Sequence, residues 1–135
     1  MTEYHVIIVA GGSGQRMGTS IPKQFLLISG KPVLMHTIER FHAALPHLNV
    51  VLVLPQDHHD TWHSLVETHQ FTKPFTLTTG GDTRYASVKN GLKLISSGIV
   101  GVHDGVRPLV SIKTIQTSFR GAAENGNAVP VIEVS

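Results

Sequence analysis

Five short apolar runs divide the chain, and segments with a helical repeat separate them. The runs are Val6–Ala10, Val50–Leu54, Phe75–Thr79, Ile99–His103 and Ala128–Val134. Four of them are rich in Val and Ile with little polar alternation, which predicts strands buried on both faces of a parallel sheet. The run Phe75–Thr79 alternates more, so we expect that strand nearer an edge of the sheet.

The segments between these runs carry apolar residues at intervals of three and four, the repeat of a helix that buries one face. They are Pro32–Leu45, Thr83–Ser97 and Ser111–Glu124, with a weaker helix at Asp60–His69. In the second of them the buried stripe is expected to comprise Tyr85, Val88, Leu92 and Ile95. Ser111 is the expected N-cap of the last helix, and Asn125–Gly126 its end.

Strands that alternate with helices predict a Rossmann-like, doubly wound α/β fold, with a mainly parallel sheet and helices on both faces. The 135 residues are 41% hydrophobic, enough for one domain with a core, and neither repeats nor low-complexity linkers divide residues 1–135. Ser135 directly follows an apolar strand, without a closing helix. We therefore expect a domain that is truncated at its C-terminus.

Charge and cysteine content exclude several classes of protein. The formal net charge is +2, and no run of basic residues stands out, which argues against a nucleic-acid-binding arm. Without cysteine the chain has no disulfides, thiolate chemistry or Cys-based zinc sites. No apolar run approaches the roughly 18 residues of a membrane helix, and no leader pattern opens the chain. We expect a cytoplasmic protein that binds neither nucleic acid nor membrane.

A glycine-rich loop follows the first predicted strand and is the strongest chemical motif. It reads AGGSGQRMG from Ala10 to Gly18, with Arg16 near its end and Lys23 seven residues after that arginine. Consecutive free backbone N–H groups cradle anions, and two cations nearby suit phosphoryl or nucleotidyl transfer. The dinucleotide fingerprint fails because Met17 stands where a third glycine is needed, which disfavours an oxidoreductase. A tight turn with two solvated cations is the simpler alternative.

Two further polar segments follow predicted strands, where ligands bind in such sheets. In GGDTRYAS, two glycines precede Asp82, which either contacts a ligand or caps the helix, and Ser87 lies near enough to join a base-recognition pocket. In HDGVRP, the carboxylate of Asp104 is suited to Mg²⁺. An ion pair between Asp104 and Arg107 that shapes the turn is the structural alternative.

The histidines and the single tryptophan give weaker indications. His58, His59 and His63 cluster near a helix start, but no carboxylate arrangement supports a zinc site. A solvated helix start explains them better. Trp62 is expected in the core rather than as a stacking platform.

Four stretches in order and at matching spacing make the chain resemble the 2-C-methyl-D-erythritol 4-phosphate cytidylyltransferases of the non-mevalonate isoprenoid pathway. They are AGGSGQRMG, PKQF, GGDTRYASV and HDGVRP, and the resemblance covers essentially all 135 residues. It implies a nucleotidyltransferase fold, dependence on Mg²⁺, homodimers, and CTP and a sugar-alcohol phosphate as substrates. The product would be 4-diphosphocytidyl-2-C-methyl-D-erythritol, with release of pyrophosphate.

By the same resemblance, each matching residue receives an expected role. Arg16 and Lys23 would stabilise the transition state at the α-phosphate, and Arg107 would lie near the nucleotide sugar or the second substrate. Asp104 would bind the magnesium ion. Cytosine would be read by Gly81, Asp82 and Ser87, and the loop that cradles cytosine and phosphates would comprise Ala10, Gly11, Gly12, Ser13 and Gly14.

The chain also departs from the family pattern. Many members have Ala where this chain has Gly11, and Ala–Ala in place of Gly105–Val106. Members continue well past residue 135, into a half that supplies the dimerisation arm, much of the acceptor site and a second acidic metal ligand. Two alternatives therefore stand beside the preferred function: a ribitol-5-phosphate cytidylyltransferase, and a fragment that binds CTP without turning it over.

Overall fold

The computed structural model describes residues 3–10, 21–108, 110–125 and 131–134. In this part of the chain, a five-stranded sheet has the order β5-β4-β1-β6-β7, and every neighbouring pair is parallel. Its strands are β1 (Tyr4–Val9), β4 (Asn49–Leu54), β5 (Thr76–Thr79), β6 (Ile99–Asp104) and β7 (Val131–Glu133). The sequence-predicted parallel sheet is confirmed, and β5 lies at an edge as expected.

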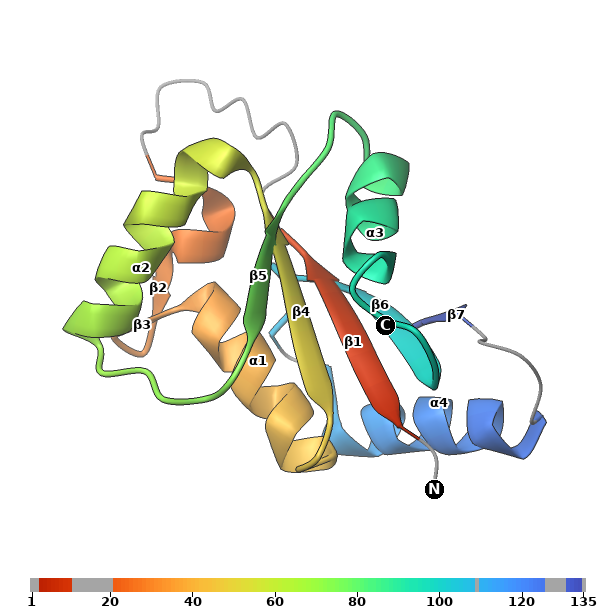
Figure 1. Cartoon of the computed structure of the whole chain (residues 1–135). Helices are drawn as coiled ribbons and strands as arrows, with labels where there is room; N and C mark the ends of the chain where they lie inside the picture. Colours follow the sequence, from red (N-terminus) through yellow and green to blue (C-terminus); the bar gives the residue numbers. More distant parts are fainter. Residues whose placement is uncertain (1–2, 11–20, 109, 126–130, 135) are drawn as a thin grey trace.

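Helices cover both faces of the sheet (Figure 1). On one face the core includes side chains of α1 (Val33–Ala44), α2 (His59–Thr68) and α4 (Ile112–Asn125). On the other face α3 (Arg84–Leu92) packs against β1 and β4. The doubly wound arrangement predicted from the alternating elements is therefore present.

The central strand β1 shows why an apolar run without polar alternation becomes a doubly covered strand. Successive side chains of a strand point to opposite faces. Val6 and Ile8 accordingly enter the core with α1 and α4, while Ile7 enters the core under α3, and all three are fully buried. A polar residue at any of these positions would be buried without a partner on either face.

Short elements that the periodicity did not predict connect β1 to α1. They are a 3-10 turn η1 (Lys23–Phe25) and a hairpin of β2 (Leu27–Ile28) and β3 (Lys31–Pro32). The hairpin turn has positive φ at Ser29 (53°) and Gly30 (80°), the backbone conformation that glycine adopts at no steric cost. A further 3-10 turn, η2 (Gln56–His58), precedes α2.

The caps of α4 and the place of the tryptophan agree with the sequence expectations. The Thr114 backbone N–H donates to Ser111 Oγ at 2.9 Å, the bond of an N-cap, and α4 ends at Asn125. Gly126 lies outside the described residues. Trp62 is fully buried beside Phe71 and Phe75, so its expected core position is confirmed.

Three expectations were wrong, one about where a helix ends and two about buried residues. Tyr85 is 77% exposed, and α3 ends at Leu92 rather than Ser97, although Ile95 still packs into the core from the following turn. The strand predicted at Ala128–Val134 is not buried on both faces. In β7 as described, Ile132 packs against the α1 and α4 side, whereas Val131 is 49% exposed on the other face, where α3 packs mainly against β1, β4 and β5.

Two glycines permit a matched test of this packing. A Cβ on Gly101 in β6 would lie 2.7 Å from Phe119 Cζ and 3.0 Å from Val134 Cγ2, whereas a Cβ on Gly121 in α4 meets nothing within 4 Å. We predict that Gly101→Ala lowers the free energy of unfolding by about 1–3 kcal/mol through overpacking. Gly121→Ala should raise it by about 0.5–1 kcal/mol, because alanine favours the helix. Chemical denaturation of both variants checks the signs, and an equal effect would contradict the close packing at Gly101.

Candidate functional site

The candidate site lies at the carboxyl ends of the parallel strands. The strand order reverses between β1 and β6, because the chain builds β4 and β5 on one side of β1 and then β6 and β7 on the other. In doubly wound sheets the loops diverge at such a point and leave a crevice for a ligand. All of the sequence-predicted site segments follow strands at this edge, except Lys23, which comes later in the loop from β1.

Backbone hydrogen bonds continue the sheet by one residue beyond three strand ends. The N–H of Ala10 donates to Val53 O at 3.1 Å, that of Gly80 to Leu54 O at 2.9 Å, and that of Gly105 to Val9 O at 2.9 Å. Each bond fixes one residue of a predicted segment, the residue that directly follows a strand, to a neighbouring strand. The start of each loop is therefore set by the sheet.

Asp104 ends β6 and opens the tight turn that follows it. Its Oδ1 accepts a bond from the Val106 N–H at 3.2 Å, and its Oδ2 lies 4.0 Å from Arg107 Nε. The Asp104 side chain is 41% exposed and that of Arg107 64%, so the ion pair is weak in water. Asp104 thus shapes the turn, as the structural alternative expected, and its carboxylate is also accessible to a ligand.

The buried side chain of His103 connects this turn to the last described strand. Its ring nitrogens lie 2.6 Å from Val134 O and 2.9 Å from Arg107 O, and its ring packs edge-on against Phe41. The sequence analysis placed this histidine at the end of a predicted strand and in the HDGVRP motif, without a role of its own. Its contacts hold the turn after Asp104 to the end of β6, and they hold the backbone at Val134 beside it.

The surroundings of Asp104 bear on the predicted magnesium ion. In the described ranges no group of three or more His, Cys, Asp or Glu side chains could hold a metal. A single accessible carboxylate suits Mg²⁺ when substrate phosphates and water supply the remaining oxygens, which is the usual arrangement for this ion. The residues present fit a magnesium ion that arrives with a nucleotide.

Gly81 and Ser87 form one packed unit at the start of α3. The Gly81 N–H donates to Ser87 Oγ at 3.0 Å, and a Cβ on Gly81 would lie 2.5 Å from Ala86 Cβ. Ser87 is buried, so its hydroxyl holds the loop against the helix. The structure therefore brings Gly81 and Ser87 together, with a positioning role for Ser87 that the sequence did not indicate.

The N-cap of α3 is Thr83, not Asp82. Thr83 Oγ1 accepts a bond from the Ala86 N–H at 3.0 Å. Asp82 is exposed one residue earlier. The alternative role of Asp82 as a helix cap is wrong, and its carboxylate is accessible to a ligand.

Lys23 begins η1 and is held by the two residues that follow it. Gln24 is buried and its Nε2 lies 3.1 Å from His58 Nδ1, while Phe25 is stacked on Trp62 with ring centroids 6.2 Å apart. Pro22 directly precedes Lys23, with a φ of −58°. These anchors fix the backbone at Lys23, whose side chain is exposed.

Two of the three histidines near α2 contact the residues that hold this region, whereas all three were expected to be solvated. His58 contacts Gln24, and His59 Nε2 lies 3.0 Å from Leu54 O. Both rings are half-buried. His63 is exposed, as expected.

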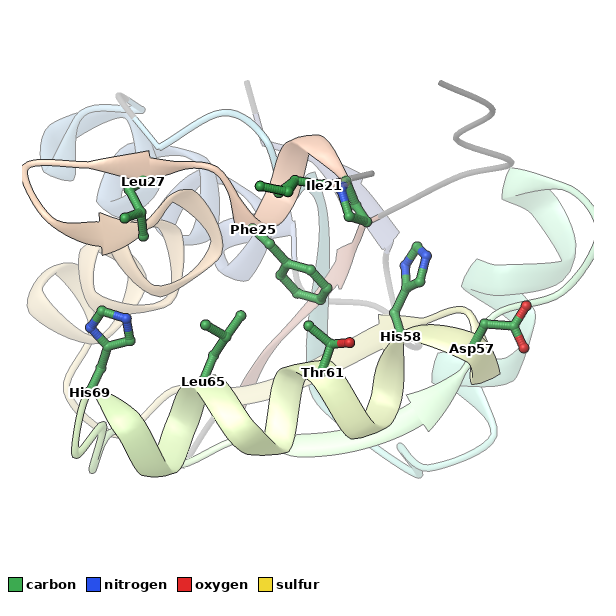
Figure 2. A pocket seen from close by; sticks show the side chains of 9 residues that line it. Ile21, Phe25, Leu27, Asp57, His58, Thr61, Leu65 and His69 are labelled. Atoms are coloured by element: carbon green, nitrogen blue, oxygen red, sulfur yellow. The ribbon is translucent and has the colours of Figure 1, made fainter. Parts of the chain in front are cut away.

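A pocket of about 540 Å³ opens beside Lys23, between the segment after the glycine loop and α2. Figure 2 shows Ile21, Phe25 and Leu27 on one wall, facing Thr61 and Leu65 of α2. Among the residues that the structure describes, the pocket lining includes none of the predicted site residues, although Pro22 and Phe25 flank Lys23 in the chain. It is largely apolar and distinct from the strand ends that carry Asp82 and Asp104.

Five predicted site residues lie outside the described residues. They are Gly11, Gly12, Ser13, Gly14 and Arg16. Ala10 is described, and it is buried just after β1. A Cβ atom placed on Gly105 would lie 2.8 Å from the Cβ atom of Ala10. Ala10 and the turn after Asp104 therefore lie in contact.

Proteins with similar sequences indicate the family of this chain. The family model of 2-C-methyl-D-erythritol 4-phosphate cytidylyltransferase matches residues 4–135. The chain belongs to this family. The protein of that name from Bacteroides thetaiotaomicron is 49% identical over 130 residues, covering 96% of this chain, and that from Porphyromonas gingivalis is 51% identical over 128 residues, covering 93%.

Solved structures of family members have the same fold. The 4-diphosphocytidyl-2C-methyl-D-erythritol synthase of Anaerococcus prevotii aligns with a TM-score of 0.71 at 25% identity, over 90% of this chain and 51% of its own. The cytidylyltransferase of Thermus thermophilus aligns with a TM-score of 0.62 at 28% identity, over 93% and 52%.

The chain is shorter than its relatives. It spans 59% of the length of the Bacteroides protein and 56% of the Porphyromonas protein. In the described part of the chain, no helix combines the length and the apolar character needed to cross a membrane.

Thr83 and Asp82 allow the cap to be separated from a ligand-binding carboxylate. We predict that Thr83→Ala lowers the free energy of unfolding by about 1 kcal/mol, because the Ala86 N–H loses its acceptor. Asp82→Ala should change it by less than about 0.5 kcal/mol, as for an exposed residue outside the cap. Urea denaturation of both variants measures the difference. A larger loss for Asp82→Ala would contradict the assigned cap.

Proposed function

We propose that the chain carries the CTP-binding part of an enzyme that joins CMP from CTP to 2-C-methyl-D-erythritol 4-phosphate. The match of the family model to residues 4–135 carries the proposal, because it spans all four motifs in one register. It favours this acceptor over ribitol 5-phosphate. Residues 1–135 would form a single nucleotide-binding domain of a cytoplasmic enzyme, which relatives complete with a further C-terminal region and which we expect to be a homodimer.

The proposed reaction needs no protein nucleophile. The acceptor phosphate attacks the α-phosphorus of CTP, a phosphorus–oxygen bond forms, the bond to the β-phosphate breaks, and pyrophosphate leaves. Negative charge grows on the α-phosphate oxygens and on the leaving group. Fixed positive charge stabilises this transition state more than the bound substrates, and we assign that role to Lys23 and Arg16.

The nucleotide is proposed to bind along the carboxyl edge of the sheet. Gly81, Asp82 and Ser87 would form the cytosine side, supported by the close packing of Gly81 on Ala86 and the exposed carboxylate of Asp82. The loop of Ala10, Gly11, Gly12, Ser13 and Gly14 would cradle the base and the phosphates, with Arg107 near the sugar or the acceptor.

Asp104 is the proposed ligand of Mg²⁺. When bound, the ion would neutralise phosphate charge and help to orient the triphosphate. Asp104 supplies an accessible oxygen for it, on a turn that His103 and the Val106 N–H hold in place.

The decisive test combines binding with turnover. We predict that calorimetry detects CTP binding to the chain in Mg²⁺, and that EDTA weakens this binding by about tenfold or more, since the phosphates lose their counter-ion. Pyrophosphate release should require an acceptor and be faster with 2-C-methyl-D-erythritol 4-phosphate than with ribitol 5-phosphate. Binding without release would favour a non-catalytic CTP-binding fragment. Absence of binding would contradict the proposal.

The role of Lys23 is tested by its alanine variant. In the chain extended by the C-terminal region of the Bacteroides relative, we predict that Lys23→Ala lowers kcat by on the order of a hundredfold. CTP affinity should change much less, because the lost charge acts mainly in the transition state. Lys31→Ala, which removes a lysine paired with Glu39 away from this edge, is the control. An effect on KM alone would contradict the assigned role.

A further inference from the structure

An ion pair joins the start of α3 to the end of β7, and the family motifs give it no role. Arg84 Nη1 donates to Glu133 Oε2 at 3.1 Å, and Arg84 Nη2 donates to Glu133 Oε1 at 3.3 Å. Two parallel bonds of this kind fix the orientation of both groups, not only their distance. The contact spans 49 positions of the sequence.

Stability alone does not account for the pair. The side chains of Arg84 and Glu133 are 53% and 62% exposed. Exposed ion pairs contribute little to the free energy of unfolding, since water screens the charges and ordering long side chains costs entropy. A bidentate pair at such a place acts mainly through geometry.

One end of the pair belongs to the proposed cytosine side. Arg84 is the first residue of α3, directly after Thr83, which caps the helix, and two residues after Asp82. Gly81 is fixed to this helix through Ser87. A change in the position of Arg84 would therefore also move the backbone that carries Asp82.

The other end lies beside the proposed metal ligand. Glu133 pairs in register with Val102, two residues before Asp104 on β6. Glu133 and Asp104 point to the same face of the sheet, the one that α3 covers, because Ile132 and Val134 pack on the opposite face. Sheet spacings put the Cα atoms of Glu133 and Asp104 roughly 8 Å apart.

We propose that the Arg84–Glu133 pair is a clasp that sets the cytosine-reading segment at a fixed position relative to the strand ends near Asp104. Arg84 and Glu133 are then positioning residues for nucleotide selectivity. Arg84 also neutralises Glu133, so that this carboxylate does not repel a triphosphate bound near Asp104. The inference rests on the proposed function.

The first measurement needs no nucleotide. In Glu133→Gln, amide hydrogen exchange at Gly81 and Ala86 should be faster than in the wild type, because these amides bond within the segment that the clasp holds. Glu39→Gln is the matched control, since Glu39 also accepts two bonds from one cation, Lys31, at 2.7 and 2.8 Å. Unchanged exchange in Glu133→Gln would overturn the clasp, whatever the chain binds.

The second measurement separates positioning from direct contact. Calorimetry with Mg²⁺ and CTP or UTP should show that Glu133→Gln raises the Kd for CTP about tenfold and reduces the preference for CTP, with a shift in Tm below about 2 °C. The reciprocal double variant Arg84→Glu with Glu133→Arg should recover most of both losses. Tighter CTP binding in Glu133→Gln, or no recovery in the double variant, would show instead that Arg84 contacts the nucleotide, and would overturn the proposal.

The two measurements keep the inferences distinct. If the wild-type chain binds no CTP, the proposed function fails, and the exchange experiment still decides whether the clasp holds the segment. If CTP binds with the same affinity in Glu133→Gln and Glu39→Gln, the proposed function stands and the clasp is refuted.

Discussion

Everything at the candidate site depends on the parallel pairing of β1 with β4 on one side and β6 on the other. This pairing, with β5 added in parallel on β4, brings the carboxyl ends of β1, β5 and β6 to one edge, although the segments that follow them are far apart in the sequence. It is stable because β1 is apolar on both faces and each face has its own core, one with α1 and α4 and one with α3. The reversal of strand order then falls between β1 and β6, the kind of position at which doubly wound sheets bind ligands.

The sheet also controls the loops, through bonds that lie just beyond its strands. Ala10, Gly80 and Gly105 each donate a backbone hydrogen bond to a neighbouring strand, so each loop leaves the sheet in a fixed direction. Two of these three residues, Ala10 and Gly105, must be small, because a Cβ atom on Gly105 would come too close to the Cβ atom of Ala10. Motifs that read as chemical in the sequence are therefore partly structural, and their glycines allow the close approach that fixes the polar side chains next to them.

Much of the fold could be predicted because it depends on local patterns. The apolar runs of β1, β4 and β6 leave no other arrangement than a doubly covered strand, and the repeat in α1 needs no knowledge of its partners. The errors arise where tertiary surroundings decide. Tyr85 fits the helical stripe of α3 and is nevertheless exposed. The run that contains β7 is apolar in sequence, yet Val131 is half exposed, because α3 packs mainly against β1, β4 and β5.

The same distinction, between local sequence patterns and tertiary contacts, applies to the residues of the candidate site. Asp104 and Gly81 could be placed from the sequence because they lie within two residues of a strand end, and these ends meet by topology. The choice between Asp82 and Thr83 as the cap depends on a one-residue difference in where α3 begins, which periodicity does not resolve. The contacts of Ser87 with Gly81 and of Arg84 with Glu133 join positions without any shared pattern, so only the folded chain reveals them.

These observations give one principle for the whole edge. Charged residues are few in this chain, at 15%, and Lys23 and Asp104 at the candidate site stand next to apolar or hydrogen-bonded anchors. Lys23 is followed by buried Gln24 and Phe25, and Asp104 is preceded by buried His103. An exposed charge has a defined position only if its backbone cannot move, and preorganised charge is what stabilises a transition state. The buried neighbours of Lys23 and Asp104 therefore belong to the chemistry of the site as much as the charges that they hold.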